Sequence, residues 1–319
     1  MTSASSYITK IKKVFVKGKT SEFKGHSKKV NSISWNCEGK KLASGSSDNT
    51  LRVWDLNQSR GDTYNGHFGP IEKLCWNPSS TDLVATASLD RTVRIWDIRA
   101  SKSVKTIETN SENINIDWSP DGSTIAVGNK DDQVIFIDAK KWHIISKQKF
   151  QFLVNEIKYN KNGNCIFLTN GRGCVCICQA EQMALLHTVV GHTADCTCIA
   201  FDKTGKYFAT GGADSLLCIW DAEEFIPIRV VSRYETALES LSFSYDGSII
   251  AVASESHKLE LAYVETGECV MDFSAPGPLA AVSWHPSKHV LAYAGVDNSS
   301  VRDSRDEPRG MLRVFSAFS

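Results

Sequence analysis

Three residues near the N-terminus, His26, Ser44 and Asp48, have the side-chain types of a hydrolase triad, in which an aspartate orients a histidine that activates a hydroxyl group. The same types occur in two further sets, with nearly the same spacing inside each set, and each set is followed by a tryptophan. Three active sites in one register would be unusual, whereas buried polar groups regularly bond to one another. We therefore predict structural hydrogen-bond networks and no catalytic residue. The sets are His26, Ser44, Asp48 and Trp54; His67, Thr86, Asp90 and Trp96; and His192, Thr210, Asp214 and Trp220. In the first set, Ser46 is an open alternative to Ser44.

An internal repeat accounts for this spacing. A bulky aromatic residue closes a short alternating segment seven times, at intervals of 41 or 42 residues. The seven residues are Trp35, Trp76, Trp118, Tyr159, Phe201, Phe243 and Trp284. Each is followed by a polar turn and by further short segments that are too β-branched for helices. A period of 40 to 45 residues with Gly-His upstream and Trp-Asp downstream is typical of the WD repeat.

This resemblance implies an all-β fold, a seven-bladed WD-repeat β-propeller with four antiparallel strands in each blade. We expect residues 20–24 to supply the outer strand of the last blade, which ends with residues 312–315, and so to close the ring. The expected organisation is a short basic segment over 1–19 and one propeller over 20–319. Blade 7 is longer than the others, which predicts a polar insertion at about 297–310, either a partner-binding loop or a plain insertion.

Four blades lack the tryptophan of the network, and we expect them to depend more on apolar packing. The residues at its position are Ile137, Cys178, Ala262 and Phe315.

Closely spaced cysteines raise the question of a metal site. Residues two apart on a strand project from one face about 7 Å apart, too far for neighbouring ligands of one Zn²⁺. The chain has no Cys-x-x-Cys pair, so we expect no metal and no cofactor. We predict instead that these thiols fill the interface between blades 4 and 5. The cysteines concerned are Cys174, Cys176, Cys178, Cys196 and Cys198.

The first 41 residues carry ten lysines against Glu22 and Glu38, a local charge of +8 in a chain of net charge zero. This predicts a basic sector around the ring closure, with Lys12, Lys13, Lys17 and Lys19 as its candidate contacts. Because the segment has no arginine and few aromatic residues, base-specific recognition has little support. A solvated surface, an acidic protein partner and RNA all remain open.

The sequence contains no phosphate-binding loop, zinc-protease helix or nucleophile elbow, so we expect no enzyme and no small-molecule substrate. No apolar run approaches the roughly 18 residues of a membrane helix, and the N-terminus does not resemble a secretory signal. We therefore expect an intracellular protein without a membrane partner.

A candidate partner surface follows from the repeat itself. The residues just before the turn aspartates lie on a face that related propellers often use for binding, and these residues are Ser47, Leu89, Lys130 and Ala213. Leu89 would be unusually apolar if exposed, which makes it the first choice for a contact.

The imperfect blades carry a closer resemblance than the regular ones. The most telling segments are the turn Gly128-Asn129-Lys130-Asp131-Asp132 and the tryptophan-less strand around Phe136-Ile137-Asp138. Together with residues 74–78, 87–97, 112–122 and 167–171, they resemble the family of THO complex subunit 3, and the resemblance runs over all seven blades.

The resemblance implies a non-catalytic scaffold subunit of the nuclear THO and transcription-export complex, which supports messenger RNA packaging and export. Its implied partners are the other THO subunits, chiefly the large helical scaffold subunit, and through them a DEAD-box helicase, with RNA contacted mostly by the neighbouring subunits. Two alternatives remain, a propeller that binds RNA directly through its lysine-rich region and a substrate receptor of a ubiquitin ligase.

Overall fold

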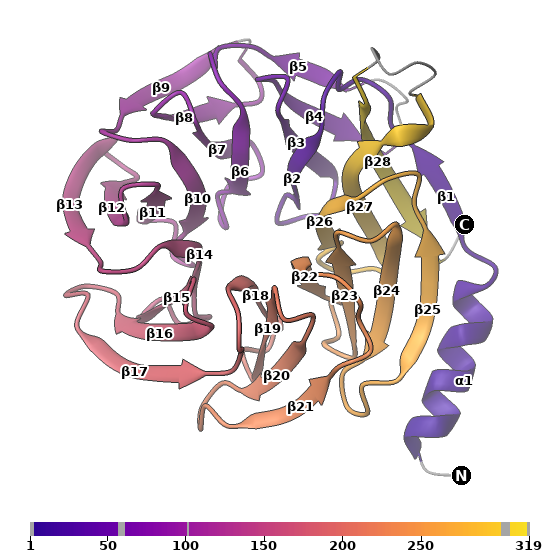
Figure 1. The fold of residues 1–319 in the computed structure, drawn as a ribbon. Coiled ribbons are helices and arrows are strands. Elements are labelled where there is room, and N and C mark those ends of the chain that lie inside the picture. The colour runs from indigo at the N-terminus through magenta and orange to yellow at the C-terminus, as the bar shows by residue number, and fades with distance from the viewer. Residues whose placement is uncertain (1–2, 57–60, 101, 301–306, 318–319) are drawn as a thin grey trace.

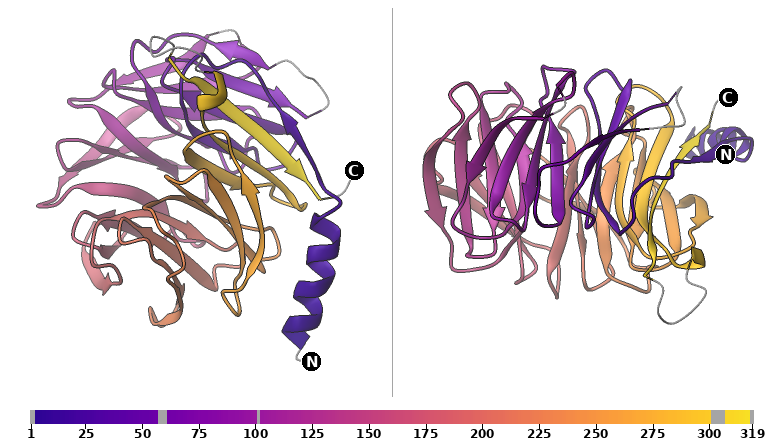
Figure 2. Two further views of the ribbon diagram at one scale, coloured as in Figure 1. Left: turned by 45° about the vertical axis from the view of Figure 1, so that its right-hand side comes forward. Right: turned by 90° about the horizontal axis from the view of Figure 1, so that it is seen from above.

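A computed structural model describes residues 3–56, 61–100, 102–300 and 307–317. These residues form seven four-stranded antiparallel sheets, arranged as the blades of a ring around a central opening (Figure 1). Seen from above, the ring is a thick disc with one helix on its rim (Figure 2). The structure confirms the seven-bladed propeller that the repeat predicts.

Each blade runs from an innermost to an outermost strand in chain order. Blade 1 contains β2 (Val30–Trp35), β3 (Lys41–Ser46), β4 (Leu51–Asp55) and β5 (Asp62–Tyr64). Blade 2 contains β6 (Ile71–Trp76), β7 (Leu83–Ser88), β8 (Thr92–Asp97) and β9 (Ser103–Glu108). Blade 3 contains β10 (Asn113–Trp118), β11 (Thr124–Asn129), β12 (Gln133–Asp138) and β13 (His143–Lys149). Blade 4 contains β14 (Val154–Tyr159), β15 (Cys165–Asn170), β16 (Cys174–Gln179) and β17 (Leu185–Val190).

The remaining blades follow the same order, except that the last one borrows its outer strand. Blade 5 contains β18 (Cys196–Phe201), β19 (Tyr207–Gly212), β20 (Leu217–Asp221) and β21 (Pro227–Val231). Blade 6 contains β22 (Leu238–Phe243), β23 (Ile249–Ser254), β24 (Lys258–Tyr263) and β25 (Cys269–Ser274). Blade 7 contains β26 (Leu279–Trp284), β27 (Val290–Asp297), β28 (Arg309–Ser316) and, from the N-terminal end of the chain, β1 (Lys19–Glu22).

The repeated aromatic residue has one structural role in all blades, because it is the last residue of every innermost strand. It is followed by a tight turn, in which Gly39 and Gly122, for example, adopt the positive φ angles of 72° and 74° that favour glycine. Every innermost strand also has a β-bulge at its second residue, such as Asn31 in β2. The Asn31 side-chain amide donates to the carbonyl of Ile71 in the next blade, at 3.0 Å, so this bulge helps to join neighbouring blades.

The ring closes where the two ends of the chain meet. Strand β1 pairs antiparallel with β28, from Lys19 opposite Ser316 to Glu22 opposite Arg313. This confirms closure by an N-terminal outer strand, although the strand ends two residues before the expected Lys24. The blade 7 hairpin is longer than expected from a looped insertion, because β27 and β28 stay paired as far as Asp297 and Arg309. The short helix η1 (Asn298–Ser300) follows, and the centre of the predicted insertion, 301–306, lies outside the described residues.

A helix precedes the closing strand, α1 (Ser3–Phe15), which the sequence analysis treats only as a basic segment. Its buried residues Ile8, Ile11 and Phe15 follow one another at helical spacing and pack on blades 6 and 7. The Tyr7 hydroxyl lies 2.8 Å from the Ser248 hydroxyl, at the N-terminal end of β23. Helix α1 therefore covers the rim of the ring beside the closure (Figure 2).

Candidate interaction surfaces

The structure brings together the four residues of each predicted polar network. In blade 2, His67 Nδ1 lies 2.7 Å from the Asp90 carboxylate and His67 Nε2 lies 2.7 Å from the Thr86 hydroxyl. The indole N–H of Trp96 donates to the same hydroxyl at 2.8 Å. The other two sets have the same arrangement, with distances between 2.7 and 3.0 Å. In blade 1 the hydroxyl belongs to Ser44, while Ser46 bonds to the carbonyl of Lys28.

The environment of these hydroxyl groups is unsuited to hydrolysis. Ser44, Thr86 and Thr210 have no exposed surface, so none of their oxygens can reach a substrate. Each oxygen is also held between a histidine and a tryptophan. The aspartate holds the turn instead: the Asp48 carboxylate accepts hydrogen bonds from the backbone N–H groups of Ser27 and Thr50, both at 3.0 Å.

The charge on this aspartate is stabilised by its neighbours. Burial raises the pKa of Asp48, but hydrogen bonds from His26 and Thr50 outweigh burial and hold the pKa well below its usual range. The pKa of Asp90 is lowered in the same way by His67 and Thr92. These aspartates therefore remain ionised, and their networks fix the turn that follows the second strand in blades 1 and 2.

The four predicted contact residues lie on one face of the ring, which we call the turn face. Each donates its backbone N–H to a carbonyl just before the innermost strand of its own blade, at 2.8 to 3.0 Å. The donors are Ser47, Leu89, Lys130 and Ala213, and the acceptors are Lys29, Pro70, Glu112 and Asp195. Lys130 and Ala213 are exposed, whereas Ser47 and Leu89 are half-buried, so Leu89 offers less apolar surface than its position suggested.

The turn face holds an aromatic residue that the sequence analysis missed. Phe68 is 88% exposed and is the most exposed of the large apolar side chains that the structure describes. Its backbone N–H donates to the Asp90 carboxylate at 3.0 Å, so the blade 2 network holds Phe68 beside Leu89 while its ring faces solvent. A signal was present, because Ser27 and Thr193 occupy the same position after Gly-His in blades 1 and 5. An exposed aromatic ring is typical of a protein contact.

A channel of about 550 Å³ lies at the centre of the ring, lined by residues of all seven innermost strands. Two ion pairs cross its wall. Lys73 of blade 2 reaches Glu156 of blade 4 at 2.9 Å, and Lys158 pairs with Asp117 of blade 3 at 2.9 Å. Burial alone would lower the pKa of Lys158, but the carboxylates of Asp117 and Glu156 raise it by more than burial lowers it. The ammonium group therefore stays charged. These pairs join different blades across the channel wall.

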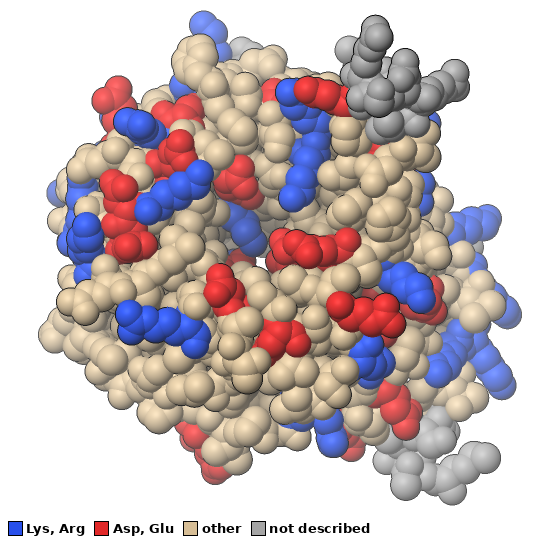
Figure 3. All heavy atoms as spheres, in the orientation of Figure 1, with Lys and Arg blue, Asp and Glu red and all other residues tan. Residues whose placement is uncertain are grey.

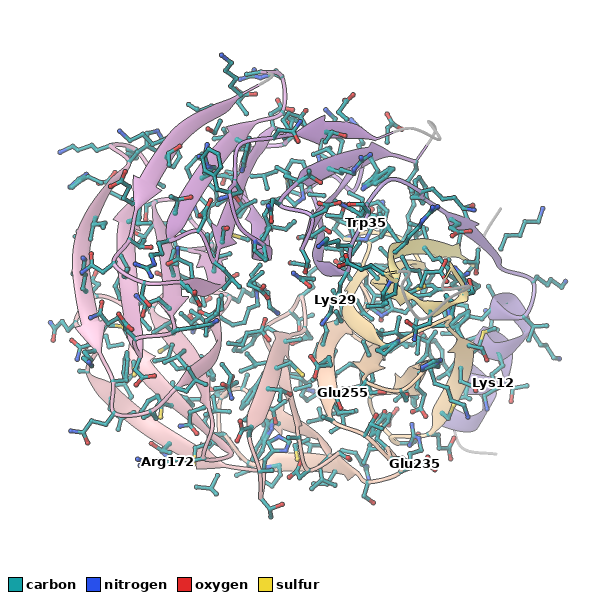
Figure 4. The ribbon with its side chains drawn as sticks, turned by 45° about the horizontal axis from the view of Figure 1, so that its top comes forward. Lys12, Lys29, Trp35, Arg172, Glu235 and Glu255 are labelled. Carbon is teal, nitrogen blue, oxygen red and sulfur yellow. The ribbon has the colours of Figure 1, made fainter. Side chains whose placement is uncertain are left out.

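Acidic side chains gather around the opening on the face that Figure 3 presents. Two of the carboxyl groups near it, Glu72 and Glu239, occupy bulge positions of β6 and β22, and burial raises the pKa of both. Figure 4 places Lys29 and Glu255 near the opening and Arg172 farther out. The mouth of the channel thus mixes both charges.

The sequence predicted that these cysteines fill the interface between blades 4 and 5. In the structure, the four buried ones lie in three different packing layers. Cys176 and Cys178 face blade 3, Cys196 lies between blades 4 and 5, and Cys198 packs towards blade 6. The reason is that alternate strand residues face opposite sides of a blade. Burial raises the pKa of the Cys178 thiol to about 11. Within the described ranges, no three His, Cys, Asp or Glu residues are grouped closely enough to hold a metal ion.

The four predicted basic contacts lie along the rim. Lys12 and Lys13 are exposed on α1, Lys17 follows the helix, and Lys19 begins β1. In Figure 4, Lys12 lies on the outer rim, whereas Lys29 lies near the central opening. No helix in the described part of the chain is long and apolar enough to span a membrane.

Comparisons with known proteins agree with this architecture. A family model described as the THOC3 beta-propeller domain matches residues 26–294. THO complex subunit 3 of Arabidopsis thaliana is 41% identical over 299 residues, which cover 92% of this chain and 94% of that protein. The WD repeat-containing protein AAC3 of Dictyostelium discoideum is 33% identical, over 94% of this chain and 67% of that protein. The crystal structure of the Cps50 (Swd1) β-propeller domain of Myceliophteria thermophila superimposes with a TM-score of 0.78 at 16% identity, over 94% of this chain and 99% of that one, a likeness of fold. Since both the family model and the plant relative extend over nearly all of the propeller, the chain belongs to the family of THO complex subunit 3.

Proposed function

We propose that this protein is a non-catalytic scaffold subunit of a nuclear THO complex and acts in the packaging and export of messenger RNA. The observation that carries the proposal is the 41% identity to a THO complex subunit 3 over 92% of the chain. The hydroxyl groups of Ser44, Thr86 and Thr210, which are buried and held within the blade networks, support a role in binding. Its main partner would be the large helical scaffold subunit, and a DEAD-box helicase would be reached through the complex.

We further propose that the turn face of blade 2 contributes to docking. Phe68 supplies an exposed aromatic ring on a backbone that is already held by Asp90, so little backbone conformational entropy is lost when a partner covers it. Leu89, half-buried, precedes the aspartate that holds this backbone.

Affinity purification from nuclear extract, followed by mass spectrometry, tests the assembly. We expect the tagged chain to recover the other THO subunits, with the large helical subunit retained longest as salt is raised. Recovery of a free chain, or of a ubiquitin-ligase adaptor in place of THO subunits, would refute the scaffold proposal.

The docking face is tested separately by Phe68→Asp. We expect recovery of the partner subunits to fall by about tenfold or more, as for loss of an aromatic anchor. Val190→Asp is the matched control, because Val190 is 73% exposed but lies on the outer strand β17 of blade 4. If Phe68→Asp and Val190→Asp recover partners equally well, the turn face of blade 2 is not the docking surface, even if the complex still forms.

A further inference from the structure

The exposed surface of α1 carries lysines that form no ion pair with any residue the structure describes. Lys10, Lys12 and Lys13 are exposed on the helix, and Lys17 and Lys19 continue the series into β1. None of the five forms an ion pair with a residue that the structure describes. Figure 3 shows the basic side chains crowded at the right-hand edge, where Figure 1 places α1. We call this surface the lysine rim.

The opposite side of the helix is fully occupied by its own fold. Ile8, Ile11 and Phe15 are 5%, 9% and 1% exposed, and the Phe15 ring meets those of Trp284 and Phe315. This anchoring fixes the direction of the helix, so its lysines are presented on a rigid support. Lys10 and Lys13 are three residues apart on the helix and therefore lie on one side of it, and Lys17 follows just after the helix ends.

The composition of the lysine rim distinguishes between its two possible anionic partners. Protein interfaces are enriched in aromatic residues and arginine and depleted in lysine. The rim has the opposite character, since it has no arginine, and Tyr7 and Phe15 are turned into the protein. Val16 is the one large apolar residue exposed within described residues 7–24. Unpaired lysines without aromatic residues fit phosphate groups, whose binding needs charge and neither stacking nor a shaped apolar core.

We infer that the lysine rim binds the phosphate backbone of a nucleic-acid strand without reading its bases. This property goes beyond the proposed scaffold role and does not depend on it, because the rim lies on α1 and β1 while the docking residues lie on the turn face of blade 2. RNA and DNA of equal length bind alike, since nothing on the rim recognises a base or a 2′-hydroxyl group.

Fluorescence anisotropy with the full chain and a labelled 20-nucleotide single strand tests the inference, as RNA and as DNA of the same sequence. Binding is expected to weaken steeply as KCl is raised. The variant K10Q/K13Q/K17Q is expected to bind about tenfold or more weakly at low salt. Its slope of log affinity against log salt should be less steep by about 2, since each lost phosphate contact contributes roughly 0.7 for single strands.

The matched control removes the same charge elsewhere. Lys140, Lys141 and Lys149 are exposed around β13 of blade 3, and the variant K140Q/K141Q/K149Q should keep wild-type affinity and slope. Equal melting temperatures of the two variants show that lost binding is not unfolding. The inference is wrong if the wild type does not bind at low salt, if both variants lose binding equally, or if a polyglutamate peptide of equal charge binds more tightly than the nucleic acid.

Discussion

Replacing Thr86 by valine should destabilise the protein more than its small change in shape suggests. Valine keeps the β-branched shape but removes the hydroxyl that bonds to both His67 and Trp96, at 2.7 and 2.8 Å. Thr86 has no exposed surface, so water cannot replace the lost partner. Two buried polar groups left unsatisfied cost about 1–3 kcal/mol each, so we expect a loss of about 2–6 kcal/mol in the free energy of unfolding.

Urea titration of Thr86→Val and of Thr106→Val measures this loss. Thr106 is exposed on the outer strand β9 of the same blade, so its change should stay within about 0.5 kcal/mol. The double-mutant cycle with Trp96→Phe identifies the cause, because the two losses should not add when they remove one shared hydrogen bond. If Thr86→Val unfolds at the same urea concentration as Thr106→Val, the network does not support the blade and our reasoning about it fails.

Three further perturbations follow from the contacts. Neighbours lower the pKa values of Asp48 and Asp90 in the folded protein. The two ionised carboxylates therefore stabilise the fold above the unfolded pKa of about 4, and this stabilisation is lost as pH falls from there towards the folded pKa. D48N/D90N should show a smaller drop in unfolding free energy between pH 5 and pH 3 than the wild type. Phe15→Ala should cost about 3 kcal/mol of helix docking and raise the rate of tryptic cleavage within α1 by about a hundredfold, and unchanged cleavage would mean that the helix does not depend on this ring. Asp117→Asn removes the carboxylate that pairs with Lys158 and should lower the free energy of unfolding, measured by urea titration, by about 3 kcal/mol. If the unpaired charge is the cause, D117N/K158M should restore most of this loss.

The sequence predicted the ring because its signal is repeated in every blade. Each aromatic residue at the 41 or 42-residue interval ends an innermost strand, where the same packing demand recurs. The network residues were predictable for the same reason. His, Ser or Thr, Asp and Trp occur three times at the same positions of the repeat. A single hydrogen-bond arrangement had to satisfy the buried polar groups of all three sets.

Features that occur once were harder to predict. The spacing of Ile8, Ile11 and Phe15 is helical, but a 13-residue segment with lysines and β-branched residues gains its stability from blades 6 and 7, which lie far along the sequence. Phe68 was missed because a single substitution in a repeat resembles ordinary degeneracy. Which neighbour each cysteine faces depended on strand register, which spacing alone did not provide.

Closure by β1 has a consequence for synthesis on the ribosome. Residues 19–22 are made about 290 residues before residues 313–316, so β1 has no partner for the roughly 15–60 s that this interval takes to translate. All four residues of β1, Lys19, Thr20, Ser21 and Glu22, are exposed even in the finished protein, and none is apolar. A strand of this composition can wait unpaired without attracting other nascent chains. The apolar side of α1 has no such protection, and it is the part of this protein that a chaperone would have to shield until blades 6 and 7 emerge.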